Sequence, residues 1–491
     1  MYFCIEKYIG NFMELIGRNK EIKELNAVME SEMPEFVVIY GRRRVGKTYL
    51  ANQYFKDKFT FKFTGLAKKN KKEQLHTFWS ELNRQGNITY QQPKTWYDAF
   101  EMLRNLIENS RKKGRKVIFI DELPFMDTPR SSLVTALEHF WNHWGSTRED
   151  LVLIICGSAT SWITKNIIRN HGGLHNRLTR KIYIKPFNLA ECKTYFKKHH
   201  FNFTDKEITE CYMIMGGIPF YLSLLDNSKS LTQNVDELFF RRKGKLSTEF
   251  DDLYASLFSK SKDYIAVIEA LSKKNKGLTR KEIIETTHLA NSGDLTKILD
   301  DLDNCDLIRK YRGYGKTERM NLYQLTDFYS FFYFKFIKEH GNTNNDFWIH
   351  QINTPKHNAW SGYAFEQLCL YHEAQIKQAL GISGVLTESF SWTSNKRDDE
   401  NDSRQKNAQI DLVIKRADNV VNICEMKYCS EKYILKKAYW DNLENKISAF
   451  RLENNYNGNI QFVMITTFGL SENKYSQQVI HQITMKQLFS D

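Results

Sequence analysis

The sequence is poor in proline, has few cysteines and lacks any long hydrophobic run. Seven of its 491 residues are proline, which argues against long flexible linkers. The eight cysteines form no Cys-x-x-Cys pair and no Cys/His spacing suited to zinc, so we expect reduced, half-buried thiols. The longest strongly apolar run, Leu151 to Cys156, is far short of the roughly 20 residues that cross a bilayer. With no signal-peptide pattern at the N-terminus, these absences predict a cytoplasmic protein without a membrane partner.

The charge balance is positive and unevenly distributed. Lys and Arg number 71 and Asp and Glu 58, a net charge of +13, which favours a polyanionic partner such as DNA. Residues 1–255 hold 40 basic and 29 acidic residues, whereas residues 356–491 hold 16 of each. We therefore expect any electrostatic binding of DNA to come from the first half. Its basic clusters include Lys68–Lys72, Arg111–Lys116 and Arg241–Lys245.

Alternating strand-like and helical segments in the first part of the chain predict an α/β fold. Such alternation implies a parallel sheet with helices on both faces. The predicted strands are 35–40, 59–64, 117–120, 151–156 and 181–184. We divide the chain into an α/β core at 1–187, a helical lid at 188–255, a winged helix at 256–328, a linker at 329–358 and a second α/β domain at 359–491.

A phosphate-binding loop follows the first predicted strand. Gly41-Arg-Arg-Arg-Val-Gly46-Lys47-Thr48 fits Gly-x4-Gly-Lys-Ser/Thr between a strand and a helix. Backbone N–H groups would bind phosphate, Lys47 would neutralise the β and γ oxygens, and Thr48 would reach Mg²⁺. The motif predicts ATP and Mg²⁺ as cofactors, with no further small-molecule cofactor. The expected nucleotide contacts are Gly41, Arg42, Arg43, Arg44, Val45, Gly46, Lys47, Thr48 and Tyr49.

Two carboxylates end the third predicted strand, directly after Val117-Ile-Phe-Ile. Downstream of a phosphate-binding loop, this pattern predicts that Asp121 holds Mg²⁺ through water and that Glu122 polarises the attacking water. Lys47 and Glu122 are thus the expected catalytic residues of ATP hydrolysis.

Further motifs extend this pattern: ELIGRNKEIKEL, FIDELPFM, IICGSATSWI, GGLHNRLTRKIYIKPF and MGGIPFYL. With them, roughly residues 14–330 resemble the archaeal-type ATPases of the STAND branch of AAA-like P-loop NTPases. The resemblance implies that Ser158 reads the γ-phosphate and that Arg177 is an arginine finger or sensor, with Arg180 as a substitute. It also implies that Pro219 lies in a lid turn that contacts the nucleotide, and that Arg18 lies near the base. Alternatively, the two later arginines are surface charges and Pro219 ends a helix.

A second group of charged residues is predicted near the C-terminus. Glu425 and Lys427 end a predicted strand two residues apart, so they face the same side. A hairpin would bring Asp411 beside Glu425, and Glu366 in the preceding helix is a candidate third carboxylate. Converging carboxylates repel unless a cation lies between them, which predicts a metal site at which Lys427 orients or deprotonates the attacking water. Two other Glu-x-Lys matches, ending at Lys446 and Lys474, lie in polar sequence and are set aside.

The order of these residues, on helix, strands, helix and strand, resembles the PD-(D/E)xK restriction-endonuclease fold, with Ile410-Asp411 in place of Pro-Asp. The resemblance implies that Asp411, Glu425 and Lys427 are the catalytic residues of DNA cleavage, with Glu366 as a further metal ligand. A fold kept only for binding is the alternative.

The predicted winged helix has an unusual charge pattern. Its third helix exposes an acidic face, which fits the major groove poorly because carboxylates would approach phosphates. Its hairpin instead alternates cations with Tyr311 and Tyr314. Two interpretations stay open: contact with DNA through the hairpin, or a structural docking module. The cations are Arg309, Lys310, Arg312, Lys316 and Arg319.

Two main functions follow from these patterns. The first is an ATPase that controls a metal-dependent, DNA-cleaving C-terminal domain. The second is a STAND-type regulatory switch that forms homo-oligomers and whose C-terminal domain only binds DNA or protein. Transcription regulation through the winged helix is a third, which the acidic helix disfavours.

Overall fold

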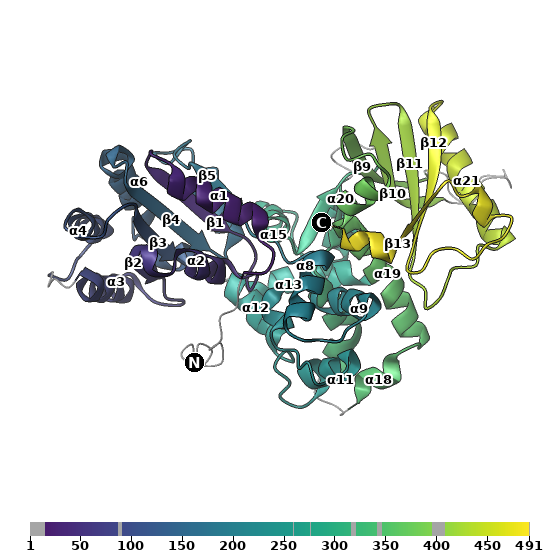
Figure 1. Ribbon diagram of the computed structural model, residues 1–491, viewed down its shortest axis with the longest axis horizontal. Helices are drawn as coiled ribbons and strands as arrows, with labels where there is room; N and C mark the ends of the chain where they lie inside the picture. The colour runs from purple at the N-terminus through teal and green to yellow at the C-terminus, as the bar shows by residue number, and fades with distance from the viewer. Residues whose placement is uncertain are drawn as a thin grey trace. The chain divides into compact units, whose positions relative to one another are not determined.

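The chain folds into two compact units, residues 1–186 and residues 187–491, which are described separately (Figure 1). No helix in the described part of the chain is long and apolar enough to cross a bilayer. The computed structural model describes residues 15–86, 91–258, 260–274, 276–315, 321–340, 346–394 and 408–490.

The first unit is built on a five-stranded parallel sheet in the order β2-β3-β4-β1-β5. The predicted α/β fold with a parallel sheet is confirmed, and strand ends differ from expectation by at most one residue. The strands are β1 (Glu35–Tyr40), β2 (Phe59–Thr64), β3 (Lys116–Asp121), β4 (Leu151–Gly157) and β5 (Arg180–Tyr183). The longer helices are α1 (Asn19–Glu30), α2 (Lys47–Phe55), α3 (Lys71–Gly86), α4 (Trp96–Glu108) and α6 (Leu133–His143).

Burial explains why these strands read as continuous apolar runs. Every residue of β3 and β4 is buried, so both alternating sets of side chains lie inside and helices cover both faces. On one face, Phe78 of α3, Phe100 of α4 and Trp141 of α6 share a core with alternate strand residues. The polar ends of the strands are therefore held on a rigid, fully packed sheet.

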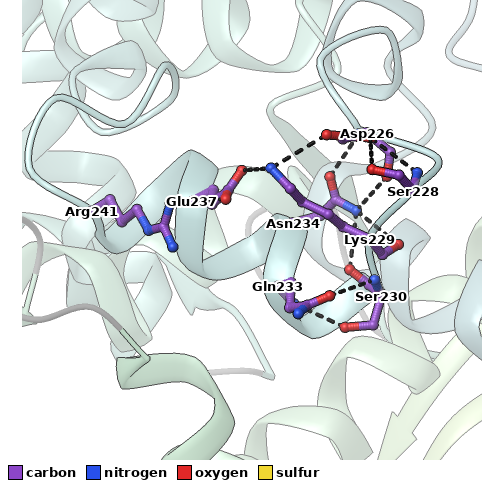
Figure 2. Close-up of polar contacts among 8 residues, drawn as sticks. All are labelled: Asp226, Ser228, Lys229, Ser230, Gln233, Asn234, Glu237 and Arg241. Carbon is purple, nitrogen blue, oxygen red and sulfur yellow. Dashed lines mark hydrogen bonds and ion pairs between the residues drawn. The ribbon is translucent and has the colours of Figure 1, made fainter.

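The second unit begins with a helical region, in which the described residues contain no strand, as expected. A buried amide organises its central loop (Figure 2). Asn234 is 1% exposed, and its Nδ2 donates to the carbonyl oxygens of Asp226 (3.0 Å) and Ser230 (3.0 Å). Its Oδ1 accepts from the N–H of Asp226 at 2.7 Å, so one side chain closes the loop. The helices are α8 (Leu189–Lys198), α9 (Asp205–Met215), α10 (Pro219–Leu222), α11 (Leu231–Val235), the π-helix η5 (Asp236–Phe240) and α12 (Glu249–Leu257).

The described residues of the segment 329–358, which was expected to be a linker, contribute to the core of the second unit. Tyr329, Phe332 and Phe336 are completely buried, and Trp348 is 4% exposed. The hydroxyl of Tyr254 on α12 hydrogen-bonds Ser330 at 2.9 Å. The aromatic richness of this segment therefore reflects burial. Its helices are α16 (Phe328–Phe332), the π-helix η7 (Tyr333–Ile337), α17 (Lys338–His340) and α18 (Phe347–Gln351).

Three helices and a small antiparallel sheet follow the pattern predicted for a winged helix. The sheet has the order β6-β8-β7, in which β7 and β8 form the predicted hairpin and β6 is an unpredicted third strand. The elements are α13 (Ser261–Lys273), β6 (Leu278–Thr279), α14 (Arg280–Thr287), α15 (Gly293–Asn304), β7 (Ile308–Tyr311) and β8 (Leu322–Leu325).

The C-terminal region contains a mixed five-stranded sheet in the order β13-β12-β11-β10-β9. β10 is antiparallel to both neighbours, whereas β11, β12 and β13 are parallel. The edge strand β13 was not predicted because it is short and half polar. The elements are α19 (Pro355–Tyr371), α20 (Glu373–Ala379), β9 (Thr387–Thr393), β10 (Gln409–Arg416), β11 (Val420–Lys427), α21 (Lys437–Asn454), β12 (Asn459–Thr466) and β13 (His481–Thr484).

The hairpin of the winged helix contacts this C-terminal sheet. The N–H of Tyr314 donates to the carbonyl of Ser391 in β9 at 2.9 Å, and its ring packs on Phe390 and Phe450 at 5.3 and 5.1 Å. Arg309 Nε donates to Gln324 Oε1 at 2.7 Å, within the hairpin. These contacts favour the docking interpretation. Lys316 and Arg319, also expected to bind phosphate, lie outside the described residues.

A buried histidine ties α8 to the C-terminal helices. His372 is 1% exposed; its Nδ1 lies 2.9 Å from the carbonyl of Leu368, and its Nε2 accepts from the N–H of Leu189 at 3.0 Å. The acceptor role requires a neutral ring with the proton on Nδ1. Burial lowers the pKa of His372 to about 4, although the Leu368 carbonyl opposes that shift.

We expect acid to destabilise the second unit through His372. Between pH 6.5 and pH 4 the histidine binds a proton in the unfolded state but not in the folded state. The free energy of unfolding therefore decreases as the pH is lowered, by about 3 kcal/mol in total. Urea unfolding of His372→Gln should show a smaller loss between pH 8 and pH 5 than the wild type. His350→Gln, at an exposed position, should keep the wild-type slope. An unchanged slope in His372→Gln would contradict the assignment.

Candidate functional site

The loop between β1 and α2 depends on two glycines. Gly41 has φ +144°, and a Cβ there would lie 2.3 Å from the carbonyl oxygen of Ile184. Gly46 caps α2 at φ +91°, in the left-handed region that glycine favours. The loop therefore bends tightly against the end of β5 and opens directly into a helix N-terminus, where backbone N–H groups suit phosphate.

Lys47 and Thr48 begin α2 and lie beside the third strand. Lys47 is 5% exposed, and its Nζ donates to the carbonyls of Gly41 (2.9 Å) and Arg42 (2.8 Å). Thr48 Oγ1 donates to Asp121 Oδ2 at 2.7 Å. The hydroxyl and carboxylate oxygens that are predicted to hold Mg²⁺ thus already lie together.

Glu122 is held by the neighbouring strand. Ser158 follows β4, and its Oγ and N–H donate to the two carboxylate oxygens of Glu122 at 2.5 and 3.1 Å. Because β4 lies between β3 and β1, the loop, Ser158 and the Asp121–Glu122 pair follow three adjacent strands. Carboxyl ends of parallel strands are the usual place for ligands in such sheets.

Arg18 is buried and hydrogen-bonded to the backbone of the phosphate-binding loop. It is 6% exposed, and its guanidinium donates to the carbonyls of Val45 (3.0 Å) and Lys185 (2.8 Å). Backbone carbonyls therefore engage both terminal nitrogens, and contact with the base stays a prediction.

Three other expected nucleotide residues lie later in the chain. Arg177 is exposed after the turn that follows Leu174, and Arg180 donates to the carbonyl of Thr179 at the start of β5. Pro219 opens α10 in the second unit. Their predicted roles toward the nucleotide stay predictions. The remaining loop residues, Arg43, Arg44 and Tyr49, lie half-buried in the loop and in α2.

The C-terminal carboxylates converge as the strand spacing predicts. Leu412 pairs with Cys424 in the antiparallel β10–β11 ladder, which puts Asp411 and Glu425 next along the two strands. Lys427 Nζ lies 4.0 Å from Glu425 Oε2 and over the ring of Tyr439, 5.0 Å from its centre. Gln409 Nε2 donates to Asp411 Oδ1 at 2.6 Å. Two carboxylates and a lysine thus come together on adjoining strands.

Glu366 on α19 completes the group electrostatically. Burial and the nearby charge of Asp411 raise the pKa of Glu366 to about 8, with Glu425 adding to the shift and Lys427 and Lys446 opposing it. A buried acid next to two others holds its proton because a further negative charge there is unfavourable.

Two residues of α21, which the sequence analysis missed, bind Glu425. Lys446 Nζ donates to Glu425 Oε1, and the Tyr439 hydroxyl donates to Oε2 at 2.8 Å. They lie seven residues apart, on one face of the helix. That spacing is the signal that sequence could have offered, but Lys446 sat in a Glu-x-Lys match that was set aside.

The expected role of Glu366, Asp411 and Glu425 as metal ligands stays a prediction. In the described ranges, no group of three or more His, Cys, Asp or Glu side chains is arranged to hold a metal ion. Lys446 instead supplies a positive charge beside Glu425.

Part of the chain is similar to a known protein family. Residues 15–225 match the model of a family described as an ATPase domain predominantly from Archaea. This region is an archaeal-type P-loop ATPase domain. The match ends before the winged helix and the C-terminal sheet, so the ATPase assignment covers the loop, the Asp121–Glu122 pair and the first helices of the second unit.

Longer similarities are weaker. An uncharacterized protein of Methanocaldococcus jannaschii is 25% identical over 359 residues, 72% of this chain and 76% of its own. The Walker-type ATPase of Pyrococcus abyssi is 16% identical, with 66% of this chain and 96% of that one covered at a TM-score of 0.47. The Aeropyrum pernix ORC2 protein is 14% identical, with 66% and 94% covered at a TM-score of 0.40.

We expect variants of Glu122 and Lys47 to separate ATP hydrolysis from ATP binding. Glu122→Gln should bind ATP within about threefold of wild type, while its turnover falls 10²- to 10⁴-fold because the group that polarises water is lost. Lys47→Ala should lose ATP binding itself. Nucleotide affinity from a fluorescent ATP analogue and phosphate release check both. Wild-type turnover in Glu122→Gln would assign that role to another residue.

Proposed function

We propose that this ATPase controls a metal-dependent DNA-cleaving site in its C-terminal region, formed by Glu366, Asp411, Glu425 and Lys427. The observation that carries the proposal is the convergence of these acids and the lysine on β10, β11 and α19. Burying such a group costs free energy, and groups of this kind are concentrated at functional sites. Its donors are hard carboxylate oxygens, which suit Mg²⁺.

The chain's own residues divide the work at this site. Asp411, Glu425 and a deprotonated Glu366 would hold the metal, and Lys427 would orient a water molecule toward a phosphodiester and take up its proton. When bound, the metal supplies a positive charge that stabilises the negative charge developing on the phosphate. Tyr439, packed against the Lys427 amine, restricts where that amine can point.

At the nucleotide site, Thr48 and Asp121 would hold Mg²⁺ and Lys47 would neutralise the phosphates. Glu122 would position the attacking water once Ser158 no longer holds both of its oxygens. We propose that release of the Glu122 carboxylate by Ser158 distinguishes the ATP-bound protein from the protein without nucleotide.

A second candidate is a STAND-type regulatory switch that assembles into homo-oligomers and whose C-terminal domain only binds DNA or protein. One observation favours it: Lys446 and Tyr439 already engage both oxygens of Glu425. ATP-bound Glu122→Gln would then form an oligomer detectable by light scattering, whereas a monomer in every nucleotide state would count against it.

The basic segment after η5 is the best candidate for holding DNA. Arg241 pairs with Glu237 at 2.8 Å, and Lys229 pairs with the same carboxylate at 2.7 Å, so part of this charge is neutralised within the protein (Figure 2). Arg242 and Lys243 are exposed. We therefore propose that these two carry the phosphate contacts of the cluster.

Cleavage is the decisive test. We expect the full chain with Mg²⁺ or Mn²⁺ to cut at least one of single-stranded, duplex or branched DNA or RNA, and ATP to change the rate. Lys427→Ala should reduce cutting at least 100-fold and leave ATP hydrolysis within twofold of wild type, because the two sites use separate residues. If wild type binds ATP yet leaves every substrate intact with and without ATP, the nuclease proposal is wrong.

DNA binding tests the basic segment. Arg242→Glu with Lys243→Glu should weaken binding at least tenfold at low salt and flatten its salt dependence, since fewer counterions are released. Lys436→Glu with Lys437→Glu makes the same charge change at exposed positions in the neutral C-terminal region, and should weaken binding far less. Equal losses in both pairs, by fluorescence anisotropy, would show that only net charge matters.

A further inference from the structure

Lys446 holds the position of a cation in the C-terminal acidic group. Its amine pairs with Glu425 Oε1 while its side chain is 14% exposed and that of Glu425 is 3% exposed. Lys427, by contrast, is 32% exposed and 4.0 Å from the other oxygen. Of the two lysines, Lys446 is therefore the closer and the more deeply buried partner of Glu425.

Both carboxylate oxygens of Glu425 accept a hydrogen bond from α21. Tyr439 donates to Oε2 and Lys446 to Oε1, and both come from this one helix. A divalent cation needs the same carboxylate oxygens as direct ligands. It would also lie against the Lys446 ammonium, where the repulsion between positive charges is strong because the site is buried.

We propose that Lys446 is a displaceable counter-ion: it occupies Glu425 in the metal-free chain, and a divalent cation binds there only as Lys446 withdraws. This inference rests on the proposed metal site and deepens it, because it makes metal binding compete with a residue of the chain. The released amine then lies at the edge of the site, where it can contact the phosphate backbone of a substrate.

Competition between Lys446 and a cation for Glu425 would move one side chain of α21 and not the helix itself. Lys446 lies in the middle of an 18-residue helix, and Leu443, Ala449 and Phe450 of the same helix are buried in the core of the C-terminal region. The helix is thus anchored by its apolar residues, so withdrawal of Lys446 requires a change of side-chain rotamer and leaves the helix in place. Lysine suits this role because its four-carbon stem is flexible.

Mn²⁺ binding to the full chain without nucleotide provides the test, measured by calorimetry at pH 8. Lys446→Met keeps the length of the side chain and removes its charge, so it should bind Mn²⁺ at least tenfold more tightly than wild type. Lys446→Arg keeps the charge and should stay within about threefold of wild type. Lys437→Met, an exposed lysine of the same helix, is the matched control and should not change the affinity. Glu425→Gln serves as the reference for Mn²⁺ binding elsewhere in the chain, because it lacks the Glu425 carboxylate.

A second measurement uses the wild-type protein and so does not depend on how a variant folds. Limited acetylation followed by mass spectrometry should modify Lys446 slowly in the metal-free chain and at least fivefold faster with Mn²⁺, relative to Lys437. Unchanged labelling, in a chain that binds Mn²⁺ through Glu425, would overturn the proposal.

The outcomes also separate this inference from the proposed function. Wild-type binding above the level of Glu425→Gln, with equal or weaker binding by Lys446→Met, overturns the displaceable counter-ion alone. No binding above that level by any variant overturns it together with the metal site. Mn²⁺ binding that appears only in Lys446→Met supports the proposal that Lys446 competes with the cation, and shows that Lys446 prevents binding in the wild type.

Discussion

A carboxylate that leaves water needs a hydrogen-bond donor or a positive charge beside it, and both candidate sites are organised by that requirement. In the first unit, the donors are hydroxyl and backbone N–H groups: Thr48 for Asp121 and Ser158 for Glu122. In the second unit, the partner of Glu425 is a lysine. Neutral donors can exchange for water and metal at little cost, whereas an ion pair resists exchange until another cation replaces it. The carboxylates of the first site are therefore stabilised by neutral hydrogen-bond donors, and Glu425 of the second site by an ion pair.

The nucleotide site was largely predictable from sequence because its geometry is local. Gly41, Gly46, Lys47 and Thr48 are set by one strand–loop–helix unit, and a buried parallel sheet puts Asp121 beside them. The strands around it are continuous apolar runs, which makes them easy to recognise. Arg18 illustrates the limit: its motif was noticed, but its contacts with the Val45 and Lys185 carbonyls join segments far apart in the sequence.

Only the part of the C-terminal site that lies on the paired strands β10 and β11 was predictable from the sequence. Residue spacing in a hairpin brings Asp411 opposite Glu425, because side chains on paired strands have a fixed register. Nothing comparable determines how a helix packs across a sheet, so Lys446 and Tyr439 were missed. The hairpin of the winged helix left two interpretations open for the same reason. Its tyrosines look like a phosphate-binding strip in sequence, yet Tyr314 packs on Phe390 and Phe450.

The backbone is hydrogen-bonded on both sides of Pro186, where the first unit ends. On one side, the carbonyl of Lys185 accepts from Arg18, whose other nitrogen holds Val45 in the phosphate-binding loop. On the other side, the N–H of Phe187 donates to the carbonyl of Gly217 at 2.9 Å. Only Pro186, with its rigid ring, lies between these two anchors. The backbone carbonyl that accepts from Arg18 and the first backbone hydrogen bond of the second unit therefore lie only two residues apart in the sequence.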